Sequence, residues 1–381
     1  MRQYTMLIFL ILIMIIFQFA THGIMLGPMN VTNIILQNAY VFILAIGMMI
    51  LLINGGNIDL AVGSVVAFIG AAMGVMVITM HWPVWVAIVI SILIGVLIGM
   101  WQGFWVAYVR IPGFIVTLAG MLIFRGITNL ILKGLTLAPF PTSFVSISCG
   151  FIPDFFKGIS ATLNVTAVVV GVILAALYIV LQVRSRSNKL KYSAEVTPFP
   201  LFLVQIVVIS AVILVAFYWL ARYNGLAIIF LVIAVLIFAY SFFTSKTVPG
   251  RYIYAMGGNE KAAKLSGINT NKVLFLCYVN MSVLAAIAGV AAASRINSAS
   301  PLAGVNYEMD AISACFIGGA SMYGGAGTVV GAIIGAMFMG VLNNGMSILG
   351  VGSSTIMVIK GLVLLLAVAF DILSKSRAKT A

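Results

Sequence analysis

The sequence predicts an all-α polytopic membrane protein, a helical bundle with about 10–12 transmembrane spans and twelve as the preferred number. Of its 381 residues, 63% are hydrophobic and only 7% are charged, whereas an ordinary globular chain has about 45–50% apolar and roughly 25% charged residues. A soluble fold cannot cover that much apolar surface with a polar shell, but lipid can surround it. The apolar residues also gather in runs near the length of about 20 residues that a spanning helix needs.

Twelve apolar runs are candidate spans. They lie at 5–21, 34–54, 60–80, 84–108, 113–132, 160–182, 200–220, 225–244, 273–293, 308–321, 326–347 and 354–373. The first run follows Met1-Arg2-Gln3 without a small-residue cleavage site, which favours a retained helix over a signal peptide. The run 308–321 is short for a hydrocarbon core of about 30 Å. We expect a half-helix or broken span there, buried in protein.

The basic residues predict that both termini are cytoplasmic. With alternating spans, fourteen of them fall in inside segments: Arg2, Arg110, Arg184, Arg186, Lys189, Lys191, Lys246, Arg251, Lys261, Lys264, Lys272, Lys375, Arg377 and Lys379. Four fall in outside segments: Lys133, Lys157, Arg222 and Arg295. This bias follows the positive-inside rule. The net charge of +13 therefore does not indicate nucleic-acid binding, because no basic face is interleaved with aromatic residues.

We predict one transmembrane domain over residues 1–381. Within it, 184–199 forms a basic cytoplasmic loop, 200–244 holds a pair of spans, and 246–272 forms a second cytoplasmic loop. The outside loop 133–159, with its PFPTSF and FIPDFF stretches, is expected to lie on the membrane interface as a cap.

Glycines spaced by four residues predict close helix packing. They occur at 95, 99 and 103, at 327, 331 and 335, and at 70 and 74, and small-xxx-small spacing lets helix backbones approach in lipid. Two glycine-rich turns followed by small-residue spans, 55–74 and 318–340, resemble each other. They are consistent with an internal repeat of the kind found in transporters.

Five charged residues fall in or beside apolar runs: Asp59, Arg125, Glu308, Asp310 and Lys360. Each costs roughly 2.5–3.5 kcal/mol at membrane depth on insertion scales, so such residues usually have a function or a partner. Asp59, Glu308 and Asp310 also begin helices, where the helix dipole favours an anion. These carboxylates can therefore either cap the helices that they precede or take part in a gate of a translocation path. For Lys360 we expect a buried partner.

The candidate residues for a translocation path or gate combine these charges with nearby polar side chains. They are Asn57, Asp59, Ser64, Arg125, Glu308, Asp310 and Asn343. For Arg125 the expectation is either one of the carboxylates as a partner or a water-filled path.

The sequence predicts neither catalysis nor a bound metal or cofactor. The three cysteines form no C-x-x-C pair, and the two histidines, His22 and His81, are isolated at the ends of apolar runs. No Gly-Lys dipeptide occurs, so the phosphate-binding loop of ATPases is absent. We therefore expect that this chain does not hydrolyse ATP.

The polar stretch GGNEKAAKLSGI, residues 257–268, predicts a short helix at the cytoplasmic side. Asn259 can cap its start, and Glu260 and Lys264 have the favourable i,i+4 order. Gly267 suits the left-handed residue that ends a helix, with Ile268 folding back against the helix.

Such a helix has only about two turns and is too short to be stable alone in water. Its small residues Ala262, Ala263 and Ser266 give a surface that another protein can approach closely. A docking helix is the favoured interpretation, and a plain positive-inside loop is the alternative.

Several segments resemble the sugar permeases of bacterial ABC importers, in the branch for ribose, galactosides, arabinose and xylose. They are GGNIDLAVGSVVAF, PGFIVTLAGMLIFRGI, GRYIYAMGGNEKAAKLSGI, SRINSASPLAGVNYEMDAISACFIGGASMYGGAGTVVGAIIGA and NNGMSILGV. The resemblance covers nearly the whole chain and is strongest to the xylose and multiple-sugar permeases, which carry an extra pair of spans like 200–244.

This resemblance implies a fold like that of the vitamin B12-type permeases and a set of partners. A second permease chain, a sugar ABC ATPase that is commonly a fused double cassette using ATP and magnesium, and an external sugar-binding protein complete such importers. The residues that the resemblance assigns to ATPase coupling are Gly257, Gly258, Asn259, Glu260, Ala262, Ala263, Ser266 and Gly267. The alternatives are an ion-coupled sugar transporter that uses Asp59, Glu308 or Asp310, and a membrane scaffold without a substrate.

Overall fold

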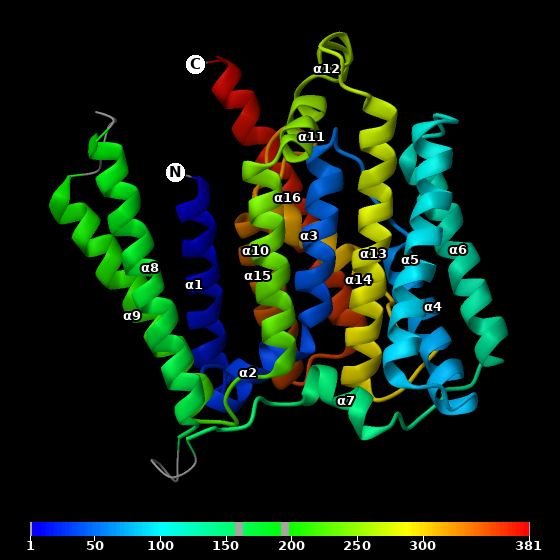
Figure 1. The fold of residues 1–381 in the computed structure, drawn as a ribbon, viewed down its shortest axis with the longest axis horizontal. Helices are drawn as coiled ribbons and strands as arrows, with labels where there is room; N and C mark the ends of the chain where they lie inside the picture. The colour runs from blue at the N-terminus through cyan, green and yellow to red at the C-terminus, as the bar shows by residue number, and fades with distance from the viewer. Residues whose placement is uncertain (1, 157–162, 192–197, 381) are drawn as a thin grey trace. The chain divides into compact units, whose positions relative to one another are not determined.

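The computed structural model describes residues 2–156, 163–191 and 198–380, and the regular elements in these ranges are helices (Figure 1). They are α1 (Arg2–Ala20), α2 (Pro28–Gln37), α3 (Ala39–Ile53), α4 (Val62–Gly74) with a π-helical turn (Val75–Thr79), α5 (Val84–Ala107), α6 (Gly113–Leu132), α7 (Thr142–Cys149), α8 (Val165–Lys191), α9 (Phe199–Ala221), α10 (Ile228–Lys246), α11 (Val248–Gly258), α12 (Glu260–Leu265), α13 (Thr270–Ile296), α14 (Tyr307–Ile317), α15 (Val329–Ile348) and α16 (Ser353–Thr380).

The predicted helical bundle is confirmed, and a helix lies over each of the twelve apolar runs. Among the described residues, 8 helices are long and apolar enough to cross a membrane, or 9 if α2 and α3 form one span bent by 47°. The apolar run 34–54 gives no sign of this bend at Asn38. Its Nδ2 donates to Ile34 O at 2.8 Å, and such local side-chain bonds compete with regular helix. The chain is a multi-pass membrane protein.

The described residues form two compact units, and unit 2 comprises 26–33 and 150–228. Its main feature is the hairpin of α8 and α9, which pack against each other. Asp154 fixes the start of α8 by accepting hydrogen bonds from Val165 N at 3.0 Å and Thr166 N at 3.1 Å. At the other end of α8, the guanidinium of Arg186 lies 4.6 Å from the centre of the Phe202 ring.

Unit 2 corrects one of the predicted boundaries. The basic segment expected as a loop from 184 is helical, because α8 continues to Lys191, and 192–197 lie outside the described residues. The two spans expected at 200–244 are present as α9 and α10. Helix α9 packs with α8, whereas α10 belongs to unit 1 from Ile229 onward. Lys157, expected outside, lies outside the described residues as well.

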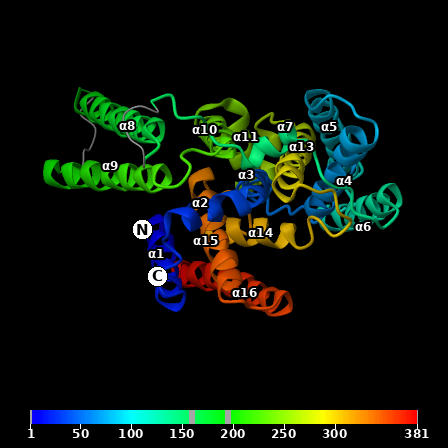
Figure 2. The ribbon, with the colours of Figure 1, turned by 90° about the horizontal axis from the view of Figure 1, so that it is seen from below.

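Unit 1 is built around α3 and α13. Helix α3 is buried along nearly its whole length, and Figure 2 shows it between α13 and α14, both of which it contacts. The glycine stripe of α5 confirms the predicted close packing: a Cβ at Gly95, Gly99 or Gly103 would press on α13 at Ser282, Val279 or Phe275. The corresponding stripe of α15 lies against α14.

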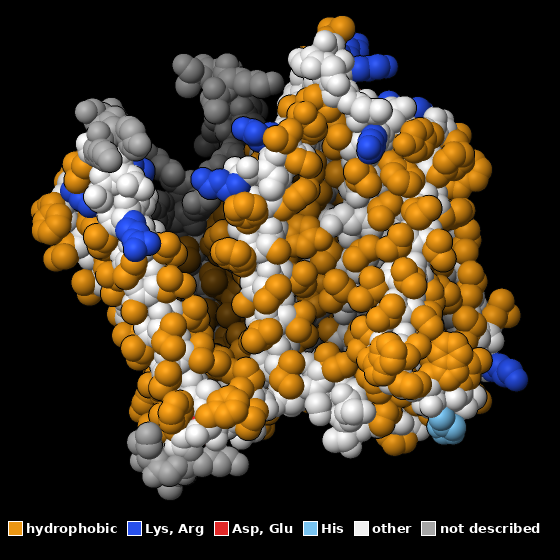
Figure 3. Space-filling model, viewed as in Figure 1, with side chains coloured by type: hydrophobic (Ala, Val, Ile, Leu, Met, Phe, Trp, Pro, Cys, Tyr) orange, Lys and Arg blue, Asp and Glu red, His pale blue; other side chains and the backbone are white. Residues whose placement is uncertain are grey.

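Unit 1 has two distinct ends. Helix α12 and both chain termini lie at one end, which we call the basic end, and α7 lies at the other (Figure 1). Hydrophobic side chains cover the flanks of α10 and α13, while Lys and Arg side chains gather at the basic end (Figure 3). The residues 142–149 of the predicted cap form α7, which packs on α13 through Ser148 Oγ and Ala291 O at 2.8 Å.

Candidate coupling and translocation site

Helix α12 projects at the basic end with the ends that its sequence predicts. Asn259 Oδ1 accepts a hydrogen bond from Ala262 N at 3.0 Å, which caps the first turn. At the other end Gly267 has φ +87°, and Ile268 N donates to Ala263 O at 3.1 Å. These bonds close both ends of the short helix α12.

Two predictions on α12 change with the structure. Glu260 does not rely on Lys264, because its Oε1 lies 3.1 Å from Arg110 Nη1. Ala263 is buried, with 5% of its surface exposed, so it holds α12 to its own protein and is not part of an approach surface. The exposed apolar side chain is Leu265, which is 90% exposed and which the sequence analysis did not select.

The base of α12 rests in a junction of three glycine-containing segments, 53–57, 257–258 and 322–327, which we call the glycine junction. Gly325 N donates to Ile53 O at 2.8 Å, and Tyr254 Oη donates to Gly327 O at 2.7 Å. A Cβ on Gly257 would overlap the carbonyl oxygen of Ile53, whereas a Cβ on Gly258 would meet nothing within 4 Å. The two glycine-rich turns that resemble each other in sequence therefore contact each other and the segment that leads into α12.

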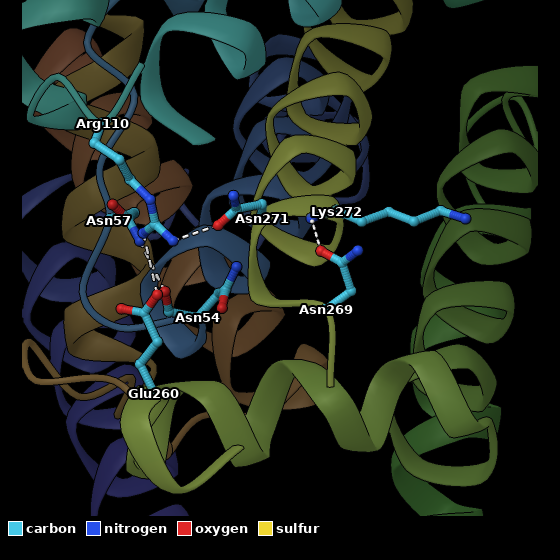
Figure 4. Close-up of polar contacts among 7 residues, drawn as sticks. All are labelled: Asn54, Asn57, Arg110, Glu260, Asn269, Asn271 and Lys272. Atoms are coloured by element: carbon cyan, nitrogen blue, oxygen red, sulfur yellow. Dashed lines mark hydrogen bonds and ion pairs between the residues drawn. The ribbon is translucent and has the colours of Figure 1, made fainter. Parts of the chain in front are cut away.

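Arg110 connects α12 to two further elements (Figure 4). It lies between α5 and α6, and its guanidinium binds Glu260 of α12 and Asn271 of α13. Asn54 and Asn57 of the glycine junction face the same small cavity of about 260 Å³. One side chain therefore joins α12, α13 and the α5–α6 loop.

Asp59 is fully buried just before α4. Its Oδ1 accepts a hydrogen bond from Ala61 N at 2.8 Å, while its Oδ2 has no hydrogen-bond partner among the described residues. The partner suggested from the sequence, Arg110, binds Glu260 instead. A buried carboxylate oxygen without a donor is costly. Among the described residues, one oxygen of Asp59 is therefore held by a local hydrogen bond, and the other is buried without a donor.

We expect Asp59→Asn to leave the melting temperature at or above that of the wild type. The amide oxygen keeps the bond to Ala61 N, and the change removes a buried charge. Thermal unfolding of the purified protein in detergent measures this, and a fall of several degrees would mean that the carboxylate is paired in the assembled protein. Substrate uptake by the same variant distinguishes two roles of Asp59. A gating role needs the charge and predicts lost uptake, whereas a purely local role in the turn predicts normal uptake.

Glu308 and Arg125 lie on either side of the loop that joins α13 to α14. Arg125 donates to two carbonyls of this loop, Pro301 O at 3.0 Å and Ala303 O at 2.6 Å. Its hydrogen-bond partners are therefore carbonyls, while Glu308 lies near enough to attract its charge without a direct ion pair. A Cβ on Gly63, in the first turn of α4, would overlap both Gly304 O and Glu308 Oε2. The beginning of α4, which includes the buried Ser64, and the beginning of α14 therefore meet closely.

Asp310 forms a buried polar cluster with residues of two other helices. Lys360 Nζ of α16 lies 2.8 Å from Asp310 Oδ1, and Tyr40 Oη of α3 donates to Asp310 Oδ2 at 2.7 Å. The rings of Tyr40 and Tyr307 stack with centroids 3.5 Å apart. The expected buried partner of Lys360 is thus Asp310, and the cluster joins α3, α14 and α16.

Asn343 binds a polar side chain and not one of these charged residues. Its Nδ2 donates to Asn38 Oδ1 at 3.3 Å, so it contacts the break between α2 and α3. Its neighbour Asn344 donates to Gln37 Oε1 at 3.2 Å. Within the described ranges, no three His, Cys, Asp or Glu side chains lie in an arrangement that could hold a metal ion.

Comparison with known proteins places the chain among importer permeases. It is 38% identical over 381 residues to the xylose transport system permease protein of Haemophilus influenzae, covering 99% of this chain and 98% of that protein. It is 36% identical over 379 residues to the Escherichia coli K12 xylose permease, covering 99% and 93%. It is 33% identical over 373 residues to the Escherichia coli K12 ribose import permease protein, covering 97% and 94%. No solved structure matches the chain.

The family match extends across both units of the structure. The sequence profile of the branched-chain amino acid transport system / permease component family matches residues 30–368, which include the glycine junction, α12 and the buried charges. The chain therefore belongs to this family of membrane permeases.

Proposed function

We propose that this chain is the pore-forming subunit of an ATP-driven importer for a monosaccharide, either a pentose such as xylose or several sugars. The observation that carries the proposal is the full-length similarity to xylose permeases, at 38% identity with nearly complete coverage of both chains. The similarity to a ribose permease over 97% of the chain supports a monosaccharide as the substrate class.

Coupling to an ATPase is assigned to the segment Gly257–Gly267, with the basic end in the cytoplasm. An exposed apolar residue on a small projecting helix supports this assignment, because Leu265 is 90% exposed at the tip of α12. A partner ATPase that buries Leu265 would push on α12. Its motion would then reach α13 and the α5–α6 loop through Arg110 and reach α3 through the glycine junction.

The partners follow from this role. A second copy of the chain would complete the pore, a fused double-cassette ATPase would bind and hydrolyse ATP with magnesium, and an external sugar-binding protein would deliver the substrate. The chain itself would be non-catalytic, and its charged residues Arg125, Glu308 and Asp310 would fix the helix breaks around the path. Asp59, Asn57 and Ser64 would lie where the coupling segment meets that path.

Leu265→Arg tests the docking part of the proposal. We expect co-purification of the ATPase with the variant to fall by roughly thirtyfold, because truncating or charging a central apolar contact costs about 2 kcal/mol or more. Leu135→Arg is the matched control, because Leu135 is also an exposed leucine, with 67% of its surface exposed. It follows the C-terminal end of α6, whereas Arg110, which binds α12, precedes the N-terminal end of α6. Equal ATPase binding by the two variants would contradict docking through α12.

The alternative of ion-coupled transport also has one observation in its favour. Asp59 Oδ2 is buried without a hydrogen-bond donor among the described residues, and carboxylates within membranes often serve in proton or ion pathways. The energy source of uptake distinguishes the two functions.

A further inference from the structure

An apolar groove opens on the flank of unit 1 between α10 and α13. It has a volume of about 520 Å³, within the range of about 300–1,000 Å³ that is typical of small-molecule sites. Its walls come from four helices, with Ile50 of α3, Phe243 of α10, Ile253 of α11, and Leu276 and Cys277 of α13 among them. Leu276 is half exposed, so the groove opens toward the flank that lipid covers.

The groove interior offers little to a polar ligand. Its two polar side chains on facing helices, Tyr240 of α10 and Asn280 of α13, bind each other through Tyr240 Oη and Asn280 Oδ1. This hydrogen bond links α10 to α13. It also occupies the hydroxyl proton of Tyr240, which is then not free to bind a ligand. The remaining lining is almost entirely hydrocarbon, which suits an acyl chain better than a sugar or another polar solute.

Three exposed basic residues lie at the basic end of the same helices. Lys246 is in the last turn of α10, Arg251 is in α11 two residues after the groove residue Pro249, and Lys272 directly precedes the groove residue Val273. Figure 4 shows Lys272 directed away from the Arg110 network. Among the described side chains none of the three has a carboxylate partner, and Glu260 is bound by Arg110.

We propose that this groove binds one acyl chain of an anionic phospholipid, whose headgroup lies against Lys246, Arg251 and Lys272. The apolar groove selects the chain, and the three cations at its end select a negative headgroup. Basic pockets between membrane helices at the cytoplasmic face suit anionic lipids in this way. The bound lipid fills the space between α10 and α13 and supports the helix that leads into α11 and α12.

Retention of lipid by the purified protein tests the headgroup. In native mass spectrometry with equal amounts of phosphatidylglycerol and phosphatidylcholine, we expect the wild type to retain phosphatidylglycerol preferentially. Each basic residue near an anionic lipid adds roughly a fivefold gain in affinity, so the triple variant K246Q/R251Q/K272Q should lose about a hundredfold. The control variant R184Q/R186Q/K189Q removes three charges from α8. Equal losses in the two variants, or equal retention of both lipids by the wild type, would overturn the proposal.

The position of the acyl chain is tested by cross-linking. Phosphatidylglycerol with a photoactivatable group in its acyl chain should label peptides of α10 and α13. Ala239→Trp fills the groove without a change of charge and should reduce this labelling about tenfold, as a lost hydrophobic contact of about 1.4 kcal/mol would. Ala234→Trp, on α10 but outside the groove lining, should not. Both variants are compared after they elute as single species. Undiminished labelling of Ala239→Trp, or labelling only of other helices, contradicts the site.

Discussion

The Gly257→Ala variant should lose most of its ATP-driven uptake, whereas Gly258→Ala should leave uptake close to that of the wild type. A Cβ at Gly257 would overlap Ile53 O and crowd Gly325 N, and both of these are backbone atoms. Backbone cannot rotate away, so the coupling segment must shift out of the glycine junction. Overpacking of this kind costs about 1–3 kcal/mol or more, and we expect uptake to fall more than about tenfold.

The measurement is substrate uptake by cells or proteoliposomes with each variant at equal membrane amounts. Gly258→Ala is the matched control, because nothing lies within 4 Å of its added Cβ. Loss of uptake in both variants would mean that this segment needs flexibility and not close packing. Normal uptake by Gly257→Ala would remove the glycine junction from the coupling path.

Replacing Lys360 with methionine should destabilise the protein strongly. Asp310 is 1% exposed and would lose the one cation that pairs with it among the described residues, leaving a buried charge with a hydrogen bond from Tyr40. Removing one partner of a buried ion pair typically costs about 3–5 kcal/mol. We expect a marked fall in the melting temperature and in the amount of protein recovered from the membrane.

The double variant K360M/D310L separates the ion pair from simple loss of the lysine stem. Replacing both partners of a buried pair with apolar residues is often neutral for stability, so the melting temperature should return most of the way to that of the wild type. A double variant that is as unstable as Lys360→Met would contradict this account of the cluster. In that case α16 would be held by packing alone.

Much of the fold could be predicted from the sequence because its signals are local. A run of about 20 apolar residues specifies a membrane helix whatever its neighbours are, and the cap at Asn259 and the left-handed Gly267 depend only on adjacent residues. The small-residue stripe of α5 also predicts close packing from spacing alone, although not that α13 is its partner.

The remainder depends on contacts between distant parts of the chain. Arg110 and Glu260 are separated by 150 residues, so their ion pair cannot be predicted from local spacing. The sequence instead favours a pair between Glu260 and Lys264, which are only one helical turn apart. The sequence indicates that Lys360 needs a buried partner, and the packing of α16 against α14 makes that partner Asp310. The exposure of Leu265 and the burial of Ala263 follow from how the two-turn helix rests on the protein, which a pattern of so few residues does not determine.

The central claim is that ATP hydrolysis on a partner, acting through α12, drives sugar through this chain. The most direct measurement is uptake of labelled xylose by proteoliposomes that contain this chain and a double-cassette sugar ATPase, with a sugar-binding protein outside and ATP inside. We expect uptake that requires ATP, persists when ionophores remove proton and sodium gradients, and is lost with Leu265→Arg. Uptake that continues without ATP and stops when the ion gradients collapse would contradict the account and identify an ion-coupled transporter.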